Sequence, residues 1–66
     1  MTIRDMTEQF TIQGMYCVKK WIDDLNDCVI FAEGNDFECE YRNLECLDNE
    51  IIYMYALDGI LNIEIK

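Results

Sequence analysis

Neighbouring carboxylates are the side chains of this chain with the clearest capacity for chemistry. Asp23 and Asp24 are adjacent, and Glu38 and Glu40 are two residues apart, so each pair offers the oxygen ligands that calcium and magnesium prefer. The calcium-loop pattern D-x-[DN]-x-[DN]-G is absent, and the chain has no histidine, the commonest general acid or base. The residues therefore predict a protein that is not an enzyme, with no catalytic, cofactor-binding or metal-binding residues and a solvated loop at each pair.

Four cysteines are the second set with chemical potential: Cys17, Cys28, Cys39 and Cys46. An even count in a short secreted chain would suggest two disulfides with three alternative pairings. The opening residues 1–5 lack the basic region and apolar block of a secretory signal, so we predict a cytoplasmic protein with reduced thiols. No CxxC pair occurs, which disfavours a structural zinc site.

The net charge of −9 is confined to the middle of the chain, because four acids balance four bases outside residues 23–50. A segregated charge gives the surface field a direction, which repels nucleic acid and membranes and attracts a basic partner. The chain has no basic stripe and no apolar run near the roughly 20 residues that span a bilayer, so we expect neither nucleic acid nor a membrane as a direct partner. Within 23–50 the one base is Arg42, and the ten acids are Asp23, Asp24, Asp27, Glu33, Asp36, Glu38, Glu40, Glu45, Asp48 and Glu50.

Part of this acidic segment is the predicted partner-binding site. Duplex DNA carries one charge per about 1.7 Å of its axis, so a protein that imitates it needs acids at high density on one surface. Residues 38–42 alternate acids with less polar side chains, which suits either an extended segment in a basic groove or an edge strand kept soluble by its charges. The site consists of Asp23, Asp24, Asp27, Asp36, Glu38, Glu40, Tyr41 and Glu45.

A short helix is predicted at the start of the chain, over about residues 3–9. Thr2 followed by Asp5 is a variant of the capping box, in which two side chains and two backbone amides satisfy one another. Apolar residues then recur at helical spacing from Ile3 onward.

Strand-like alternation follows over residues 10–22, with Gly14 as an interruption. After a polar turn the β-rich run 28–32 returns the chain and predicts a first hairpin. Residues 37–49 keep no sustained period, and we expect one helical turn near residues 43–47.

Asp58-Gly59 lies between two apolar runs, which is the strongest short-range signal for a β-hairpin with a two-residue turn. One face of that hairpin is then wholly apolar, and the other carries aromatic and aliphatic residues. The turn predicts these pairs: Leu57 with Ile60, Ala56 with Leu61, Tyr55 with Asn62, Met54 with Ile63, Tyr53 with Glu64 and Ile52 with Ile65.

Together these elements predict one small α+β domain over residues 1–66. Its short N-terminal helix packs on a four-stranded antiparallel sheet made of two hairpins joined by an acidic connection. The outer face of the terminal hairpin is either covered by Trp21 or the acidic connection, or it is an interface for a homodimer, since tyrosine is enriched at interfaces. The residues of this self-association site are Tyr53, Tyr55, Leu57 and Ile60.

Several segments resemble small, largely uncharacterised acidic proteins encoded by phages and other mobile elements of Firmicutes. They are the opening TIRDMTEQF-x-IQG, the apolar and basic strand that ends near Lys20-Trp21, the run LDNEIIYMY over 47–55, and the terminal LNIEI over 61–65. The matching positions are hydrophobic and turn residues, so the resemblance implies a fold and a genetic context and assigns no functional residue. It also implies that the protein binds and disables a host protein, such as a CRISPR effector or another defence nuclease.

Two functions of different classes follow. The first is a non-enzymatic phage or mobile-element inhibitor, anti-CRISPR-like, whose acidic and nucleic-acid-mimicking surface engages a basic surface of a host protein in the cytoplasm. The alternative is a small structural or regulatory accessory protein that self-associates through its sheet face. Salt separates them, because an electrostatic competitor weakens steeply with ionic strength and an aromatic interface does not.

Overall fold

The computed structural model describes residues 1–66, and it begins with the capped helix α1 (Ile3–Gln9). The hydroxyl of Thr2 accepts a hydrogen bond from the Asp5 amide at 3.1 Å, and the Asp5 carboxylate accepts one from the Thr2 amide at 3.1 Å. These reciprocal bonds satisfy two amides that the first turn of a helix leaves without partners. The predicted helix and its capping box are confirmed.

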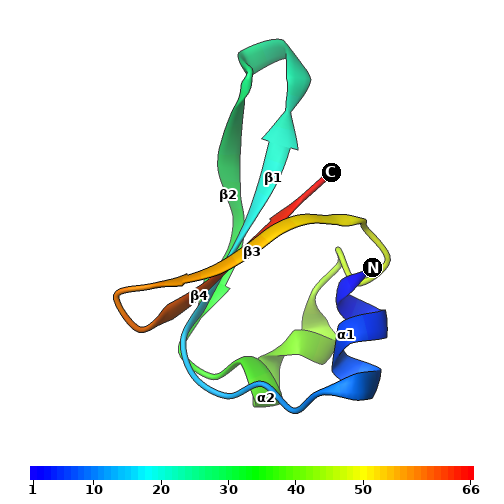
Figure 1. The fold of residues 1–66 in the computed structure, drawn as a ribbon, viewed down its shortest axis with the longest axis vertical. Helices are drawn as coiled ribbons and strands as arrows, with labels where there is room; N and C mark the ends of the chain where they lie inside the picture. Colours follow the sequence, from blue (N-terminus) through cyan, green and yellow to red (C-terminus); the bar gives the residue numbers. More distant parts are fainter.

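Two hairpins build a four-stranded sheet, as Figure 1 shows. The first joins β1 (Tyr16–Ile22) to β2 (Asp27–Gly34) through the 3₁₀ turn η1 (Asp23–Leu25), and the second joins β3 (Ile51–Leu57) to β4 (Ile60–Ile65). Between the hairpins lie α2 (Phe37–Glu40) and the 3₁₀ turn η2 (Tyr41–Asn43). The strand order is β2-β1-β4-β3, so β1 and β4 are central and β2 and β3 are the edges.

The sheet is mixed, which corrects the prediction of a purely antiparallel one. Both hairpins are antiparallel, but β1 pairs with β4 in parallel, from Tyr16 opposite Leu61 to Lys20 opposite Ile65. Parallel neighbours require a long crossover. Residues 35–50 supply it, because they carry the chain from the end of β2 back to the end of the sheet at which β2 begins. The α+β class and the four strands are confirmed.

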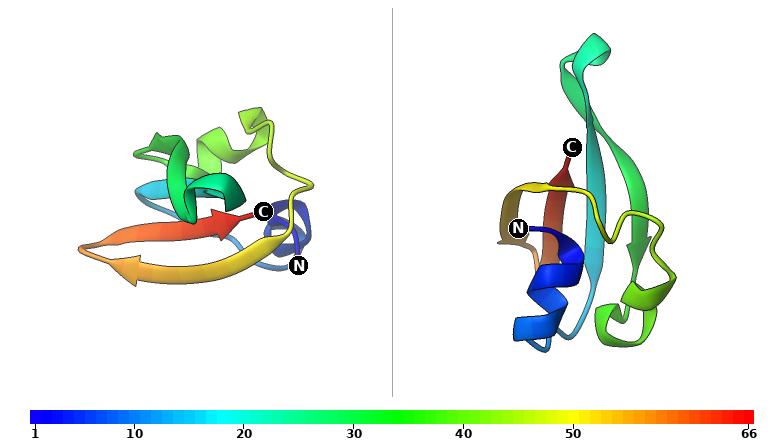
Figure 2. Two further views of the ribbon diagram at one scale, coloured as in Figure 1. Left: turned by 90° about the horizontal axis from the view of Figure 1, so that it is seen from above. Right: turned by 90° about the vertical axis from the view of Figure 1, so that its right-hand side faces the viewer.

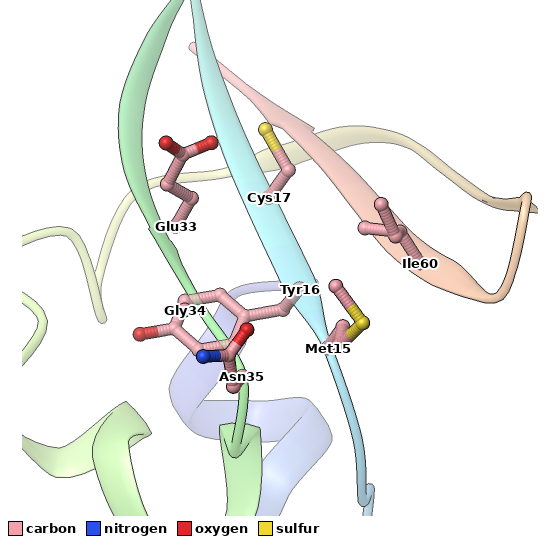
Figure 3. Close-up of a pocket in the computed structure, with 7 residues that line it drawn as sticks. All are labelled: Met15, Tyr16, Cys17, Glu33, Gly34, Asn35 and Ile60. Atoms are coloured by element: carbon pink, nitrogen blue, oxygen red, sulfur yellow. The ribbon is translucent and has the colours of Figure 1, made fainter.

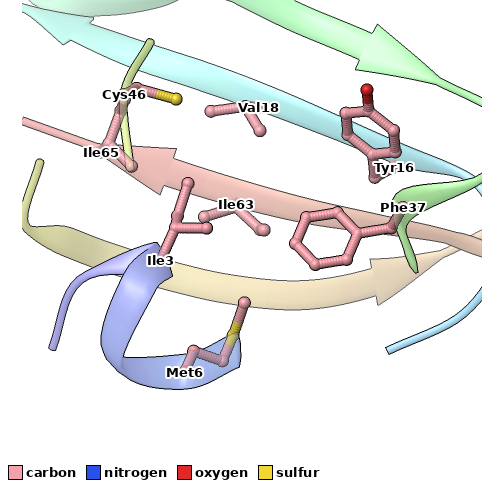
Figure 4. Close-up of a cluster of buried hydrophobic side chains, with 8 residues drawn as sticks. All are labelled: Ile3, Met6, Tyr16, Val18, Phe37, Cys46, Ile63 and Ile65. Atoms are coloured by element: carbon pink, nitrogen blue, oxygen red, sulfur yellow. The ribbon is translucent and has the colours of Figure 1, made fainter. Parts of the chain in front are cut away.

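The hydrophobic core lies between one face of the sheet and several short elements (Figure 4). We expected the N-terminal helix to cover the sheet, but α1 supplies only Ile3 and Met6, and α2 and the loop after it supply Phe37 and Cys46. A helix of 7 residues is too short to cover four strands, so the cover is shared. The buried cluster is Ile3, Met6, Tyr16, Val18, Phe37, Cys46, Ile63 and Ile65.

The terminal hairpin forms around the predicted two-residue turn. Asp58 and Gly59 both have positive φ, at 54° and 77°, which is the type I′ geometry that suits the twist of a hairpin. Five predicted pairs are confirmed, from Leu57 opposite Ile60 to Tyr53 opposite Glu64. The sixth is wrong, because an irregularity between Ile51 and Tyr53 places Ile51, and not Ile52, opposite Ile65.

Two other predictions need correction. The strand expected from residue 10 starts only at Tyr16, because Gly14 bends the chain at a φ of 103° and its carbonyl accepts from the Phe37 amide at 2.9 Å. The helical turn expected near residues 43–47 occurs earlier, as α2 and η2, because the Asp36 carboxylate caps α2 by accepting from the Cys39 amide at 3.3 Å.

Candidate functional site

The predicted partner-binding acids divide into two groups near opposite ends of the molecule, whose longest extent is 33 Å (Figure 1). The acidic tip is Asp23, Asp24 and Asp27, at the turn of the first hairpin. The acidic connection, which runs from the N-cap of α2 to the loop after η2, is Asp36, Glu38, Glu40, Tyr41 and Glu45. β2, an edge strand of the sheet, joins the two groups, so the acids are spread over the length of the molecule and do not gather in a single patch (Figure 2).

The acidic tip is shaped by backbone geometry. η1 ends at Asn26, which adopts the left-handed conformation at a φ of 51°, a geometry that asparagine tolerates well. The Asp27 carboxylate accepts from the Cys28 amide at 2.7 Å and so helps to start β2. The side chains of Asp23 and Asp24 are exposed and make no hydrogen bond or ion pair within the chain, so both charges face solvent.

Two of the four acids in the acidic connection, Asp36 and Glu40, accept hydrogen bonds that support the fold. Asp36 caps α2, and the Glu40 carboxylate accepts from the Tyr16 hydroxyl at 3.0 Å. Burial, and then this hydrogen bond, raise the pKa of Tyr16, which keeps its hydroxyl protonated and able to donate. Glu38 and Glu45 have no partner within the chain, so they are the charges of this group that are free to meet another molecule.

Tyr41 belongs to the core as much as to the surface. Its ring stacks on that of Phe37, with centroids 5.5 Å apart and planes at 20°. The guanidinium of Arg42 lies 4.8 Å from the centre of the Tyr41 ring. The one base of the acidic segment is therefore held beside the one aromatic residue of the predicted site.

Sequence reasoning missed Glu33 as a site residue. It is exposed on β2, opposite Cys17 of β1, between the acidic tip and the acidic connection. Alternation along β2 could have found it, because Ala32 packs against the core and Glu33 must then point the other way. Asp48 and Glu50, in contrast, form ion pairs with Arg4 at 2.7 Å and with the N-terminal amine at 2.6 Å.

The predicted self-association residues lie on the sheet face away from the core. Tyr53 is 64% exposed, Leu57 is 59% exposed, and Tyr55 and Ile60 are less so. Neither Trp21 nor the acidic connection covers this open face. On this face the Lys19 ammonium lies 5.9 Å from the centre of the Tyr55 ring, within the range of a cation–π interaction.

A shallow hollow of about 400 Å³ lies where β1 begins, and Figure 3 shows its lining. Cys17 is the one thiol of its lining and is buried, and Glu33 stands opposite it on the neighbouring strand. The pKa is raised at Cys28 by desolvation, at Cys39 by the hydrogen bond to Asp36, and at Cys46 by burial, so these thiols hold their protons. All four cysteines are free thiols, and no cluster of three or more candidate ligands is placed to hold a metal ion.

No protein-family model, curated protein or solved structure matches this chain. The resemblance to small acidic mobile-element proteins therefore stays a prediction. Neither helix has the length and apolar character needed to cross a membrane.

Proposed function

We propose that this chain is a non-enzymatic protein of a phage or mobile element that acts in the host cytoplasm. It binds a basic surface of a host protein and inhibits it, as an anti-CRISPR-like competitor of nucleic acid. The observation that carries the proposal is a set of acids without a hydrogen bond or ion pair within the chain, spread from the turn of the first hairpin through β2 to the connection that follows it: Asp23, Asp24, Glu33, Glu38 and Glu45.

The arrangement of these acids suits a groove that holds a duplex. One turn of duplex DNA is about 34 Å long, close to the 33 Å length of this molecule. The acidic tip and the acidic connection stand near the two ends of that length, and Glu33 on β2 lies between them. A protein that grips phosphates across a turn would meet acids at both ends of its groove.

A charge-specific variant tests the proposal. Asp23→Asn, Asp24→Asn, Glu38→Gln and Glu45→Gln together remove four charges that make no side-chain hydrogen bond or ion pair within the chain, so the fold should survive. Asp36 and Glu40 are left unchanged because each holds a structural hydrogen bond. A partner is first captured from host cytosol, and stopped-flow association is then measured at about 50 and about 200 mM salt.

We expect the variant to associate at least about tenfold more slowly at low salt and to show a flatter salt dependence, because charges at the rim of an interface act mainly on the association rate. The matched control is Glu8→Gln with Asp58→Asn, two exposed acids outside residues 23–50, which should leave the rate nearly unchanged. If the four-site variant associates as fast as the parent at low salt, the acids are only a solvated edge and the proposed inhibitor is wrong.

The second candidate is an accessory protein that self-associates through Tyr53, Tyr55, Leu57 and Ile60. The exposed tyrosine and leucine side chains of the open face favour it. Such an assembly would keep its strength between the same two salt concentrations, whereas an electrostatic complex would not.

A further inference from the structure

The two edge strands of the sheet differ in their protection against another strand. β2 carries Asp27 and Glu33, and its pairing with β1 is interrupted by a register shift between Val18 and Lys19. Charges and bulges of this kind discourage a foreign strand from pairing with an edge. β3 reads IIYMYAL, with no charged residue, no proline and no glycine, and its last five residues are exposed.

The hydrogen bonds of β4, the neighbour of β3, show which backbone groups of β3 have no partner. The Leu61 amide donates towards β1, to the Met15 carbonyl at 3.0 Å. Residues of a strand alternate in the side to which their amide and carbonyl point, so Ile60, Asn62 and Glu64 bond to β3. Their partners on β3 are Leu57, Tyr55 and Tyr53. Met54 and Ala56 therefore direct their N–H and C=O groups away from the sheet, where nothing accepts or donates.

The start of β3 is already occupied. The Ile51 amide donates to the Met1 carbonyl at 2.8 Å, and Thr2 forms an isolated bridge with Glu50. The open part of the edge is therefore residues 53–57, the part of β3 farthest from the N-terminal residues.

We propose that a second copy of this chain pairs with β3, antiparallel, about a two-fold axis at Tyr55. Met54 then faces Ala56 of the second copy and Ala56 faces Met54 of the second copy, which makes about four backbone hydrogen bonds. Tyr55 meets its own counterpart, and Tyr53 meets Leu57 of the second copy. Aromatic and aliphatic pairs of this kind stabilise neighbouring strands.

Charge argues for a second copy as the occupant. Each copy carries −9, but the strand order places the acidic β2 edge and the uncharged β3 edge on opposite sides of the sheet. Pairing through β3 forms one continuous eight-stranded sheet whose acidic edges lie at its two far ends, where their repulsion is weakest. The dimer buries exposed side chains, among them Tyr53 at 64% and Met54 at 48%, and leaves both acidic edges open. The inference does not depend on the proposed inhibitor.

Sedimentation of the full chain over a wide concentration range, combined with amide hydrogen exchange, tests this pairing. We expect the mass to rise from 7.9 kDa towards twice that value with concentration. The Met54 and Ala56 amides should exchange at least about tenfold more slowly in the dimer than in the dilute monomer, because they become hydrogen-bonded. A chain that stays monomeric, or a dimer in which both amides remain unprotected, overturns the proposal. The second result would indicate stacking through the open face.

Ala56→Pro is the matched variant. Proline removes the outward N–H of an edge residue and leaves the β3–β4 hydrogen bonds in place, so the monomer should fold. We expect dimerisation to weaken at least about tenfold. Tyr55→Lys, which places two like charges at the two-fold axis, should also weaken dimerisation. Its control is Ile30→Lys on β2, which adds the same charge to an exposed strand residue and should leave dimerisation unchanged. Dimerisation that is equally strong in Tyr55→Lys and in the parent contradicts the proposed axis.

Discussion

The two hairpins share a plan and differ in what they expose. Each contributes one central and one edge strand, but the first hairpin extends beyond the core (Figure 1), and Leu25 in its turn is 64% exposed and Ile30 in the middle of β2 is 61% exposed. The second hairpin buries Ile63 and Ile65 completely and leaves an uncharged edge. The edge strand of the first hairpin carries the acids Asp27 and Glu33, and unpaired backbone groups remain on the edge of the second hairpin.

The difference teaches that the stability of this chain and its capacity for interaction lie in different places. The core forms where β1 and β4 run side by side beneath α1 and α2. The ends of both hairpins are exposed, with Leu25 in the first turn and Leu57 beside the second. One surface is acidic and the other is apolar, so the proposed basic partner and the proposed second copy would not compete for the same residues.

Truncations at buried and exposed positions of the two hairpins should show the largest contrast. Ile63→Ala removes a side chain of 0% exposure from β4 and should lower the free energy of unfolding by about 2–5 kcal/mol. Val29→Ala on β2, where the side chain is 41% exposed, should cost less than about 1 kcal/mol. Urea unfolding followed by circular dichroism measures both, and equal losses would show that the first hairpin is as much a part of the core as the second.

The turns should give the next contrast. Gly59 has a φ of 77° and no atom within 4 Å of an added Cβ, so Gly59→Ala should cost about 1 kcal/mol through backbone strain alone. Asn26→Gly in the turn of the first hairpin keeps a residue suited to positive φ, and it should change the free energy of unfolding by less than about 0.5 kcal/mol. The same urea unfolding experiments measure both changes. A Gly59→Ala variant with an unchanged free energy of unfolding would be incompatible with a type I′ turn.

The smallest change in the free energy of unfolding should appear at alkaline pH, and it involves the buried Tyr16 at the start of β1 and the buried Cys46. The pKa of Tyr16 lies above its ordinary 10.0 because of burial and the Glu40 bond, and burial raises the pKa of Cys46 above 9.0. The folded chain then holds these protons more tightly than the unfolded chain, so the free energy of unfolding falls as pH rises past these ordinary values. Urea midpoints measured from pH 8 upward should decline less steeply in Tyr16→Phe, and an unchanged decline would remove Tyr16 as its cause.

Local patterns predicted local structure well. The capping box of Thr2 and Asp5 starts α1, and Asp58-Gly59 sets the register of the terminal hairpin, because each depends on residues a few positions apart. The register failed at Ile52, where β3 leaves its regular pairing near the segment held by Met1. No short-range pattern encodes that contact.

The sequence predicted which residues belong to the candidate surfaces, but it did not predict how those residues are arranged in space. Composition identified the acids of residues 23–50. Only the fold shows that Asp23 and Glu38 make no hydrogen bond within the chain, whereas Glu40 accepts one from the Tyr16 hydroxyl. Sequence placed Tyr53 and Tyr55 on an outer face, whereas the free groups of Met54 and Ala56 depend on which strand lies at the edge.

The sequence by itself determined the helix cap, the type I′ turn and the confinement of charge, since these follow from residue type and short-range geometry. Only the tertiary structure decided that β1 and β4 run parallel, because residues 35–50 cross the sheet and the direction of a crossover is not written in any local pattern. That crossover makes β2 and β3 the edges. It therefore places the acids of β2 on one edge of the sheet and the unpaired backbone groups of β3 on the opposite edge.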